Sequence, residues 1–546
     1  MTQTRTPREL RFVGLVCSLA FAFPGLYLIW RNFTSGADPL GLLLERQTLE
    51  PFWRTVRLAV LVSLSAAALG TALAWCTTRT DLPFRRLWRV LLPIPLVFPT
   101  FIGAAAFIRT LNPGGLANDA FSFVGISETP ELRGLFGACF VLTLFCYPYV
   151  YLPVAARLRQ LPGSLEQSAL ILGDTVPQAF RRVVLRQISG SLAAGTLLVF
   201  LYTISDFGAV QLMRYDTLTR AIESNYLARP PMAFALSLIL LMFAGVVVLA
   251  ERSINRRLPE ITTRRTSQPM THTLGGWKTS AMTLVIGTIT FAVLAPSAAL
   301  IDWASDGLLR TQRGGRPLTI DASKVVEATS NTLSSSVLTG FVALVAVTPI
   351  AFLVGRHRDR IGRFAHSVVI ATFAVPGILI ALSLRFWTLK SGFFGDLLYD
   401  SMALLIFAYV VRFGSLAMGT ALVAVRTVPD GLHDAAATLG ADRWRRFRSV
   451  DLPVMRPGLL AAAGLVVLST MKELPISLIV APIGFPTLTT RIFGSFEDAF
   501  VAEAGIMAVT LVCASALLSW FLVLRRADQN RMAFKPFDFW DQWFTK

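Results

Sequence analysis

Apolar residues form long runs along this chain, and polar residues gather between the runs. The runs show neither the alternation of half-buried strands nor the 3.6-residue spacing of amphipathic surface helices. A helix that crosses the core of a bilayer needs about 20 apolar residues. Runs of that length predict twelve transmembrane helices, near residues 12–30, 56–77, 90–110, 134–156, 192–212, 233–250, 280–301, 333–354, 366–389, 401–424, 459–481 and 502–524. The pattern therefore predicts an all-α polytopic membrane protein.

Composition agrees with this prediction and argues against an ordinary soluble protein. Of the 546 residues 54% are hydrophobic and only 15% are charged, whereas about a quarter of a soluble domain is charged. The first apolar run follows basic residues, as a signal peptide would, but it ends in Leu28-Ile29-Trp30-Arg31 without a small-residue cleavage site. We expect it to be a retained helix.

The basic residues are distributed in a way that reports topology. The net charge is +18, and Arg and Lys concentrate in alternate loops, as the positive-inside rule describes for cytoplasmic segments. These residues are Arg5, Arg8 and Arg11; Arg79, Arg85, Arg86 and Arg89; Arg252, Arg256, Arg257, Arg264, Arg265 and Lys278; Arg356, Arg358, Arg360 and Arg363; and Arg525 and Arg526. We therefore expect both termini to be cytoplasmic and no nucleic-acid partner.

The chain also repeats itself. A polar segment, 251–279, separates a first half (1–250) from a second half (280–524), each with six predicted spans, and a tail (525–546) follows. Thr55 and Thr332 lie 277 positions apart, as do the pairs Phe98-Pro99 and Val375-Pro376. Two equivalent halves predict a transporter with a pseudo-two-fold axis and a pathway between the halves.

The strongest internal match is between two loops, 161–187 and 428–454, at a constant offset of 267. We call them the first and second repeated loops. The matched residues are Pro162 and Pro429, Leu172-Gly173 and Leu439-Gly440, Phe180 and Phe447, and Leu185 and Leu452. Each glycine follows a helical pattern and can take the left-handed conformation that ends a helix. Each loop is predicted to be a short helix–turn–helix that projects from the membrane.

Both loops resemble the "EAA" loop of binding-protein-dependent ABC importer permeases. The second loop has Asp434-Ala435-Ala436, then Gly440, then Leu452-Pro453. The first loop has Gln167-Ser168-Ala169 and Gly173, with Gln167 in place of the acid (Glu166 lies one place earlier) and Arg186 in place of the proline. The resemblance implies that both loops couple the chain to an ATP-binding subunit through Glu166, Gln167, Ser168, Ala169, Gly173, Asp434, Ala435, Ala436 and Gly440.

The same resemblance implies the remaining subunits of a bacterial inner-membrane complex. They are two copies of an ATP-binding subunit and an extracytoplasmic solute-binding protein. A phosphate loop needs G-x-x-x-x-G-K-[ST], and Gly275-Gly276-Trp277-Lys278-Thr279 lacks the required glycine spacing. We therefore expect a transport subunit and not an enzyme, without catalytic residues or a cofactor of its own, with ATP and Mg²⁺ bound by the partner subunit.

Three stretches, 74–107, 200–222 and 469–493, resemble fused ferric-iron permeases, which implies ferric iron as the cargo. Asp206 and Glu473 align at the offset of 267 inside apolar spans, where a charge costs about 2.5–3.5 kcal/mol. Carboxylate oxygens suit a hard cation. We predict that both acids contact the cargo transiently, without a fixed metal site.

Arg220 and Arg491 close the two matched stretches and are included in the predicted pathway. A departure from the repeat is Pro486, which stands where the first copy has Asp216. The acids could instead pair with Lys472, Arg214 or a backbone group and hold helices together, or they could form a gate. Among the other charges in the spans, Arg109, Arg385 and Arg412 are expected near span ends.

Three alternatives stay open from the sequence. The chain could serve the same class of importer with thiamine, a phosphonate or another small solute as its cargo. It could be a secondary transporter driven by an ion gradient, although that class gives no reason for two Leu-Gly loops. It could also be a receptor or scaffold that transports nothing, but no sensor or signalling domain is apparent.

Overall fold

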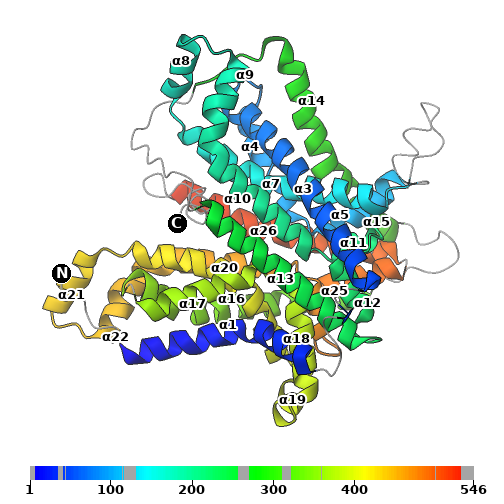
Figure 1. The fold of residues 1–546 in the computed structure, drawn as a ribbon, viewed down its shortest axis with the longest axis vertical. Coiled ribbons are helices and arrows are strands. Elements are labelled where there is room, and N and C mark those ends of the chain that lie inside the picture. The colour runs from blue at the N-terminus through cyan, green and yellow to red at the C-terminus, as the bar shows by residue number, and fades with distance from the viewer. Residues whose placement is uncertain are drawn as a thin grey trace.

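Helices form nearly all of the molecule. The computed structural model describes residues 7–34, 41–42, 45–112, 115, 131–255, 270–309, 321–357, 359–498 and 500–529. Within these residues there is no β-strand, and the only extended pairing is an isolated parallel bridge between Thr80 and His272. The prediction of an all-α polytopic protein is confirmed (Figure 1).

The helices of the first half are α1 (Arg8–Thr34), α3 (Arg46–Arg79), α4 (Arg85–Leu91), η1 (Ile94–Val97), α5 (Thr100–Leu111), α7 (Gly134–Gln160), α8 (Gly163–Ile171), α9 (Val176–Ala179), η2 (Phe180–Val184), α10 (Leu185–Ser205), α11 (Gly208–Leu212), α12 (Leu218–Asn225) and α13 (Pro230–Asn255). The first predicted span is a helix in the structure, and α13 continues five residues into the segment predicted as a linker.

The helices that follow the described end of the linker are η3 (Gly275–Trp277), α14 (Lys278–Ile289), η4 (Thr290–Leu294), α15 (Ala295–Leu309), α16 (Ala322–Gly355), α17 (Arg360–Ala371), η5 (Thr372–Ala374), α18 (Gly377–Lys390), α19 (Phe393–Leu398), α20 (Met402–Arg426), α21 (Asp430–Thr438), α22 (Arg443–Arg446), η6 (Phe447–Asp451), α23 (Leu452–Thr470), α24 (Pro475–Val480), α25 (Leu488–Glu497) and α26 (Val501–Gln529).

Ten of the described helices are long and apolar enough to cross a membrane, and two bent helix pairs raise the number to twelve. The bent pairs correspond to the predicted spans 90–110 and 366–389, which the sequence pattern presented as continuous. They turn by 100° and 104° at Pro99 and Pro376. A proline removes a backbone N–H and keeps the preceding residue out of the helical region, and Phe98 and Val375 are indeed extended.

Two further spans end earlier in the chain than predicted. Helix α10 ends at Ser205 and helix α23 ends at Thr470, so the predicted spans 192–212 and 459–481 each break next to the acid that they contain. A second short helix, α11 or α24, follows each break. The helix breakers beside the acids, Gly208 and Pro475, are compatible in sequence with a discontinuous helix or with an ordinary kink, and the structure has the discontinuous helix in both halves.

The repeat is visible in the structure of the two repeated loops. Helices α8 and α9 and the π-helical turn η2 have counterparts in α21, α22 and η6 whose bounds are all displaced by 267 residues. In both loops the glycine is left-handed, with φ of +95° at Gly173 and +76° at Gly440. The next amide closes the helix end, from Asp174 to the Ala169 carbonyl and from Ala441 to the Ala436 carbonyl. The predicted helix–turn–helix is confirmed.

The first span of each half packs against the other half. Helix α1 contacts α16, α17 and α18, and α15 contacts α5 (Figure 1). Gly414 of α20 makes the approach of α1 possible, because a Cβ there would lie 2.4 Å from the Phe21 ring of α1. At the helix ends, Arg11 of α1 pairs with Asp359 at 2.7 Å, and Arg109 of α5 pairs with Asp302 of α15 at 3.0 Å. The two halves are therefore intertwined.

Candidate functional site

Asp206 is largely buried in the break between α10 and α11, and its carboxylate is hydrogen-bonded within the first half. The Thr100 hydroxyl, at the start of α5, donates to Oδ2 at 2.6 Å. The backbone N–H groups of Ala209 and Val210 donate to Oδ1 at 3.0 and 3.4 Å. The carboxylate therefore caps α11 and joins it to the broken span. This matches the structural alternative in which the acid pairs with a backbone group.

Glu473 occupies the equivalent break between α23 and α24. Its carboxylate accepts from the N–H of Ile476, the counterpart of Ala209 at an offset of 267. Its Oε1 atom is buried and has no hydrogen-bond partner among the described residues. Gly377, at the start of α18, stands where the first half has Thr100, and a Cβ there would lie 2.3 Å from Oε1. The second half therefore accommodates a longer acid by using a smaller facing residue.

The backbone around each acid is held by the same three hydrogen bonds in both halves. Thr219 and Thr489 donate to the carbonyls of Asp206 and Glu473, at 2.7 and 3.0 Å. Their hydroxyls bond to Thr217 and Thr487, both at 3.0 Å. The N–H groups of Leu218 and Leu488 donate to Thr55 and Thr332, both at 2.8 Å. The paired threonines identified from the sequence thus fix equivalent segments.

The two halves meet beside the acids. A Cβ on Gly208 would lie 3.1 Å from Leu474 Cδ2 of the second half. The rings of Phe207 and Phe493 lie 6.0 Å apart. Asp206 and Glu473 therefore each lie within two residues of a contact between the halves.

Two cations in the spans bind carbonyls at the breaks. Lys472 Nζ donates to Leu96 O of the first half at 2.9 Å. Arg412 lies in the middle of α20 and donates to the carbonyls of Phe373 and Val375, at 2.9 and 2.5 Å. The expectation that Arg412 lies near a span end is wrong. Its guanidinium satisfies carbonyls that a broken helix exposes inside the membrane.

Arg220 and Arg491 do not occupy equivalent positions. Arg220 is the third residue of α12 and bonds to Gln211 and Asp216. Arg491 is the fourth residue of α25, and its Nε is buried without a hydrogen-bond partner among the described residues. Among the described contacts, neither arginine forms an ion pair with Asp206 or Glu473.

The departure at Pro486 has a structural counterpart. In the first half Asp216 pairs with Arg54 at 3.0 Å. In the second half Asn331 stands where the first has Arg54, and its amide donates to the Pro486 carbonyl at 3.1 Å. The loss of the acid therefore accompanies the loss of its basic partner, and a neutral hydrogen bond replaces the ion pair.

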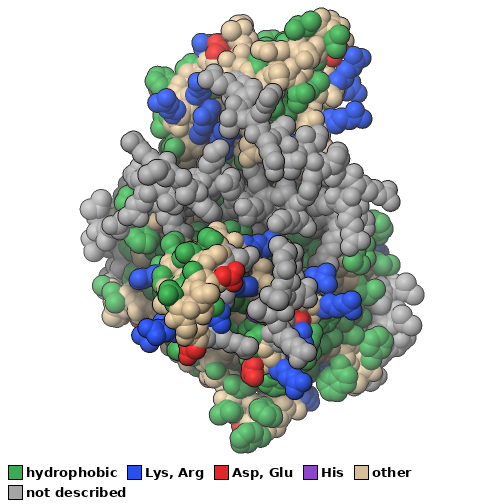
Figure 2. All heavy atoms as spheres, turned by 90° about the vertical axis from the view of Figure 1, so that its left-hand side faces the viewer, with side chains coloured by type: hydrophobic (Ala, Val, Ile, Leu, Met, Phe, Trp, Pro, Cys, Tyr) green, Lys and Arg blue, Asp and Glu red, His purple; other side chains and the backbone are tan. Residues whose placement is uncertain are grey.

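The repeated loops present apolar tips. The equivalent residues Leu172 and Leu439 are 86% and 87% exposed. Gln167, Ser168, Gly173, Asp434, Ala435 and Gly440 are exposed, Ala436 is half-buried, and Glu166 and Ala169 are buried. Figure 2 shows the face of the molecule that carries these loops, with Lys and Arg side chains around them. A large exposed leucine at each tip, within a basic surface, is typical of an interaction site.

One cluster at this end was not predicted from the sequence. Glu166 of α8 lies 3.1 Å from the Arg79 guanidinium and 2.9 Å from His272 Nε2. His272 belongs to the described end of the linker. The signal was present as three titratable residues, but nothing in their spacing relates positions 79, 166 and 272. The sequence analysis used Arg79 only as a topology signal and assigned Glu166 to the contact with the ATP-binding subunit. It did not single out Thr100, the partner of Asp206.

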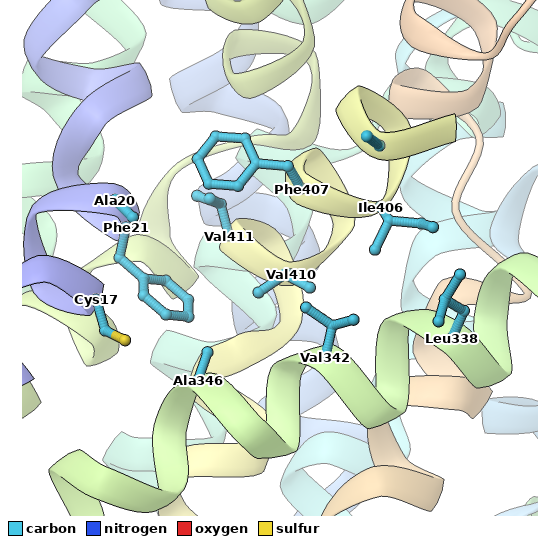
Figure 3. Close-up of a pocket in the computed structure, with 11 residues that line it drawn as sticks. Cys17, Ala20, Phe21, Leu338, Val342, Ala346, Ile406, Phe407, Val410 and Val411 are labelled. Atoms are coloured by element: carbon cyan, nitrogen blue, oxygen red, sulfur yellow. The ribbon is translucent and has the colours of Figure 1, made fainter. Parts of the chain in front are cut away.

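An apolar cavity of about 410 Å³ lies elsewhere, between α1, α16 and α20 (Figure 3). Its wall includes Phe21, Val342, Phe407 and Val411, and none of its lining residues is charged. It offers no carboxylate to a metal ion. Among the described residues no group of three or more His, Cys, Asp or Glu side chains is arranged to hold a metal.

Comparison with known proteins identifies the repeated unit. Residues 66–260 and 347–531 each match the family model described as binding-protein-dependent transport system inner membrane component. The chain belongs to this family. Because the model occurs twice, two permease domains are fused in one chain, as the internal repeat predicted.

The names of individual relatives give different cargoes. The permease is 26% identical over 529 residues to the Fe(3+)-transport system permease protein FbpB 2 of Haemophilus influenzae, which covers 94% of this chain and 97% of the relative. It is 29% identical over 195 residues to a probable molybdenum ABC transporter permease protein of Haloferax volcanii, a match that covers 35% of this chain and 70% of the relative. It is 30% identical over 156 residues to the sulfate transport system permease protein CysT of Salmonella typhimurium, a match that covers 29% of this chain and 55% of the relative.

The family decides between the classes that the sequence left open. The chain is a multi-pass permease subunit of an ABC importer in the inner membrane, and it is not an enzyme. A separate nucleotide-binding subunit hydrolyses ATP, and a solute-binding protein is the other partner that the family implies. These findings contradict the alternatives of an ion-gradient transporter and of a receptor without transport.

Proposed function

We propose that this permease imports ferric iron that a solute-binding protein delivers. The observation that carries the proposal is the match to the Fe(3+)-transport permease, which extends over nearly the full length of both chains. The molybdenum and sulfate relatives match shorter parts of the chain. Thiamine, phosphonate and other small solutes are the alternative cargoes within the same class.

The chemistry at the contact between the halves is compatible with a cation. Glu473 has a buried carboxylate oxygen without a hydrogen-bond partner among the described residues, and such an oxygen suits a hard cation. Asp206 and Glu473 would contact the ion transiently as the halves move apart, with Arg220 and Arg491 at the border of the path.

Two copies of the nucleotide-binding subunit would dock on the two repeated loops, on the cytoplasmic side, with both termini on that side. The exposed leucines Leu172 and Leu439 are the apolar anchors of this interface. Asp434 is exposed on the second loop, whereas Gln167 takes its place on the first. No cofactor is assigned to this chain, since ATP and Mg²⁺ belong to the docked subunits. The motion of the two docked subunits would alternate access between the halves.

The experiment is uptake of radiolabelled ferric iron by vesicles that contain the permease, its neighbouring ATPase subunit and its binding protein. The control complex carries an inactive ATPase subunit. ATP-dependent accumulation of iron supports the proposal. Assembly of all three proteins without iron uptake overturns the cargo, and sulfate, molybdate, thiamine and a phosphonate would then be tried in the same vesicles.

Variants test the two sites separately. Leu172→Ser and Leu439→Ser should reduce co-purification of the ATPase subunit. Asp206→Asn and Glu473→Gln should leave co-purification intact and lower iron uptake, whereas Asp396→Asn, a change of an exposed acid in α19, serves as the control and should leave both unchanged. Iron uptake that is unchanged in Asp206→Asn and Glu473→Gln would show that neither acid contacts the cargo.

A further inference from the structure

The described end of the linker, segment 270–274, runs along the end of helix α3. The His272 N–H donates to the Arg79 carbonyl at 2.8 Å, and the Asp81 N–H donates to the His272 carbonyl at 3.2 Å. The Leu274 N–H then donates to the Asp81 carboxylate at 2.9 Å. Three hydrogen bonds in a row therefore attach this short segment, directly before α14, to the chain that leaves α3.

The His272 side chain continues this attachment into the first repeated loop. Its ring stacks on Trp75 of α3, with the centroids 5.4 Å apart and an interplanar angle of 24°. Its Nε2 lies 2.9 Å from Glu166 Oε2 of α8. The imidazole is thus held on one side by α3 and makes a polar contact with α8 on the other.

Arg79 completes the cluster from inside. Its side chain is fully buried and lies 3.1 Å from Glu166 Oε1. The same guanidinium donates to the Leu161 carbonyl at 2.8 Å and to the Met270 carbonyl at 3.4 Å, so it touches the base of the first repeated loop and the linker segment together. A buried ion pair with several hydrogen bonds keeps a fixed geometry, because separating the charges there is costly.

The second half has a different arrangement at the equivalent place. Arg356 occupies the position of Arg79 at an offset of 277, and it forms an ion pair with Asp451 of η6, at 3.8 Å. Position 433, which corresponds to Glu166, is a histidine. Helix α21 therefore offers no carboxylate there, and its acid, Asp434, lies one place later and is exposed.

We propose that segment 270–274 is a strap that holds the first repeated loop against α3, with Glu166 and His272 as positioning residues for that loop and not contacts with the ATPase subunit. Motion of the docked subunit would then pass from α8 into α3 and α14 together through this cluster. The functional part of the proposal rests on the proposed docking of the ATPase subunit on the loops, and it does not depend on the cargo.

The structural part is tested on the purified full-length permease alone. His272→Phe keeps an aromatic ring for Trp75 but loses the polar contact with Glu166, and Glu166→Gln keeps the shape but loses the charge. Amide hydrogen exchange in α8 should become roughly tenfold faster in both variants. Gln167→Ala, an exposed neighbour on the same helix, is the matched control and should exchange like the parent protein. Unchanged exchange in His272→Phe and Glu166→Gln would overturn the strap.

The functional part is tested in the assembled transporter. The ATPase subunit should still co-purify with both variants and hydrolyse ATP, while the cargo moved per ATP falls by roughly fivefold or more. The double variant should lose less than the sum of the two single effects, because both changes weaken the same cluster. Release of the ATPase subunit by Glu166→Gln, as expected for Leu172→Ser, would overturn the positioning role and make Glu166 a docking residue. Additive effects in the double variant would also overturn it.

Discussion

Thr100 and Gly377 occupy the same place in the two halves, and each fits the acid that it faces. Thr100 supplies a hydroxyl to the shorter side chain of Asp206. Gly377 leaves room for the additional methylene of Glu473, whose Oε1 would lie 2.3 Å from a Cβ at that position. The two halves therefore reach the same backbone arrangement with different pairs of residues, and a side-chain hydrogen bond joins Thr100 to Asp206.

We expect Gly377→Ala to impair the permease because the new methyl group and Glu473 Oε1 cannot both stay in place. Crowding of this kind in a packed interior costs about 1–3 kcal/mol, and transport should fall with it. Thermal unfolding in detergent and transport in vesicles measure the two effects. Gly494→Ala is the control, since a Cβ there meets no atom within 4 Å. Equal behaviour of both variants would contradict the steric explanation.

A second variant copies the first half. Gly377→Thr combined with Glu473→Asp would reproduce the pair formed by Thr100 and Asp206, and it should unfold at a higher temperature than Gly377→Thr alone. If the combination is no more stable than the single change, the two positions do not act as a pair.

Asp359 provides a pH-dependent contact between α1 and the second half. Its burial opposes ionisation, but hydrogen bonds from Arg11 and from the Ile361 N–H, together with the Arg11 charge, lower the pKa of Asp359 below its ordinary value. A carboxyl whose pKa is lowered by folding stabilises the folded state above its unfolded pKa of about 3.9. That contribution is lost as the pH falls through the lower folded pKa.

We therefore expect Asp359→Asn to be less stable than the parent protein at pH 6, by about 1 kcal/mol because Arg11 is half exposed. The difference should shrink as the pH falls below about 4. Unfolding followed at several pH values in the same detergent checks this. A difference that grows on acidification would contradict the sign of the argument.

Glycines Gly173 and Gly440 end equivalent helices in a conformation that other residues rarely adopt. No atom would meet a Cβ at either position, so a substitution there acts through the backbone alone. Gly173→Val and Gly440→Val should each cost about 1–2 kcal/mol in the turn and uncouple ATP hydrolysis from transport. The ratio of cargo moved to ATP hydrolysed is the measurement. Gly431→Val, in helix α21 directly before Gly440 and also in open space, should change this ratio less.

The repeated loops were predictable from the sequence because their signals are local. A helical pattern, a glycine and a second helical pattern recur at one offset, and the structure reproduces the bounds of α8 and α21 at that offset. The breaks at Pro99 and Pro376 were not predicted, although both prolines had been noticed as a matched pair. A proline in a membrane helix is compatible with a continuous span or with a sharp break, and the choice depends on groups far away in the chain, such as Arg412 and the Phe373 carbonyl.

The candidate site was predictable in part for the same reason. Asp206 and Glu473 stood out as charges within apolar runs, so their proximity to the contact between the halves was expected. Their environments were not, because Thr100 and Gly377 carry no signal until the fold brings them next to the acids. The cluster of Arg79, Glu166 and His272 was missed because it joins three distant segments.

The intertwined first spans decide how the whole permease holds together. Helix α1 lies against α17 and α18, and α15 lies against α5, so each half covers a surface of the other. The ion pairs of Arg11 with Asp359 and of Arg109 with Asp302 fasten the same two crossings. None of these contacts requires a continuous chain between the halves.

We therefore expect the halves to stay together after the chain is cut. A protease site inserted between residues 262 and 263 should allow complete cleavage of the purified permease, and a tag on one fragment should still recover the other in mild detergent. The first fragment expressed alone should accumulate poorly, because the surfaces of α1 and α5 that pack on the second half would face lipid. Separation of the fragments on cleavage would show that the covalent connection, and not the crossing of α1 and α15, unites the two permease domains. Transport by the cleaved complex would further show that the fused chain works as two associated permease domains, with the strap at 270–274 still attached to the second fragment through α14.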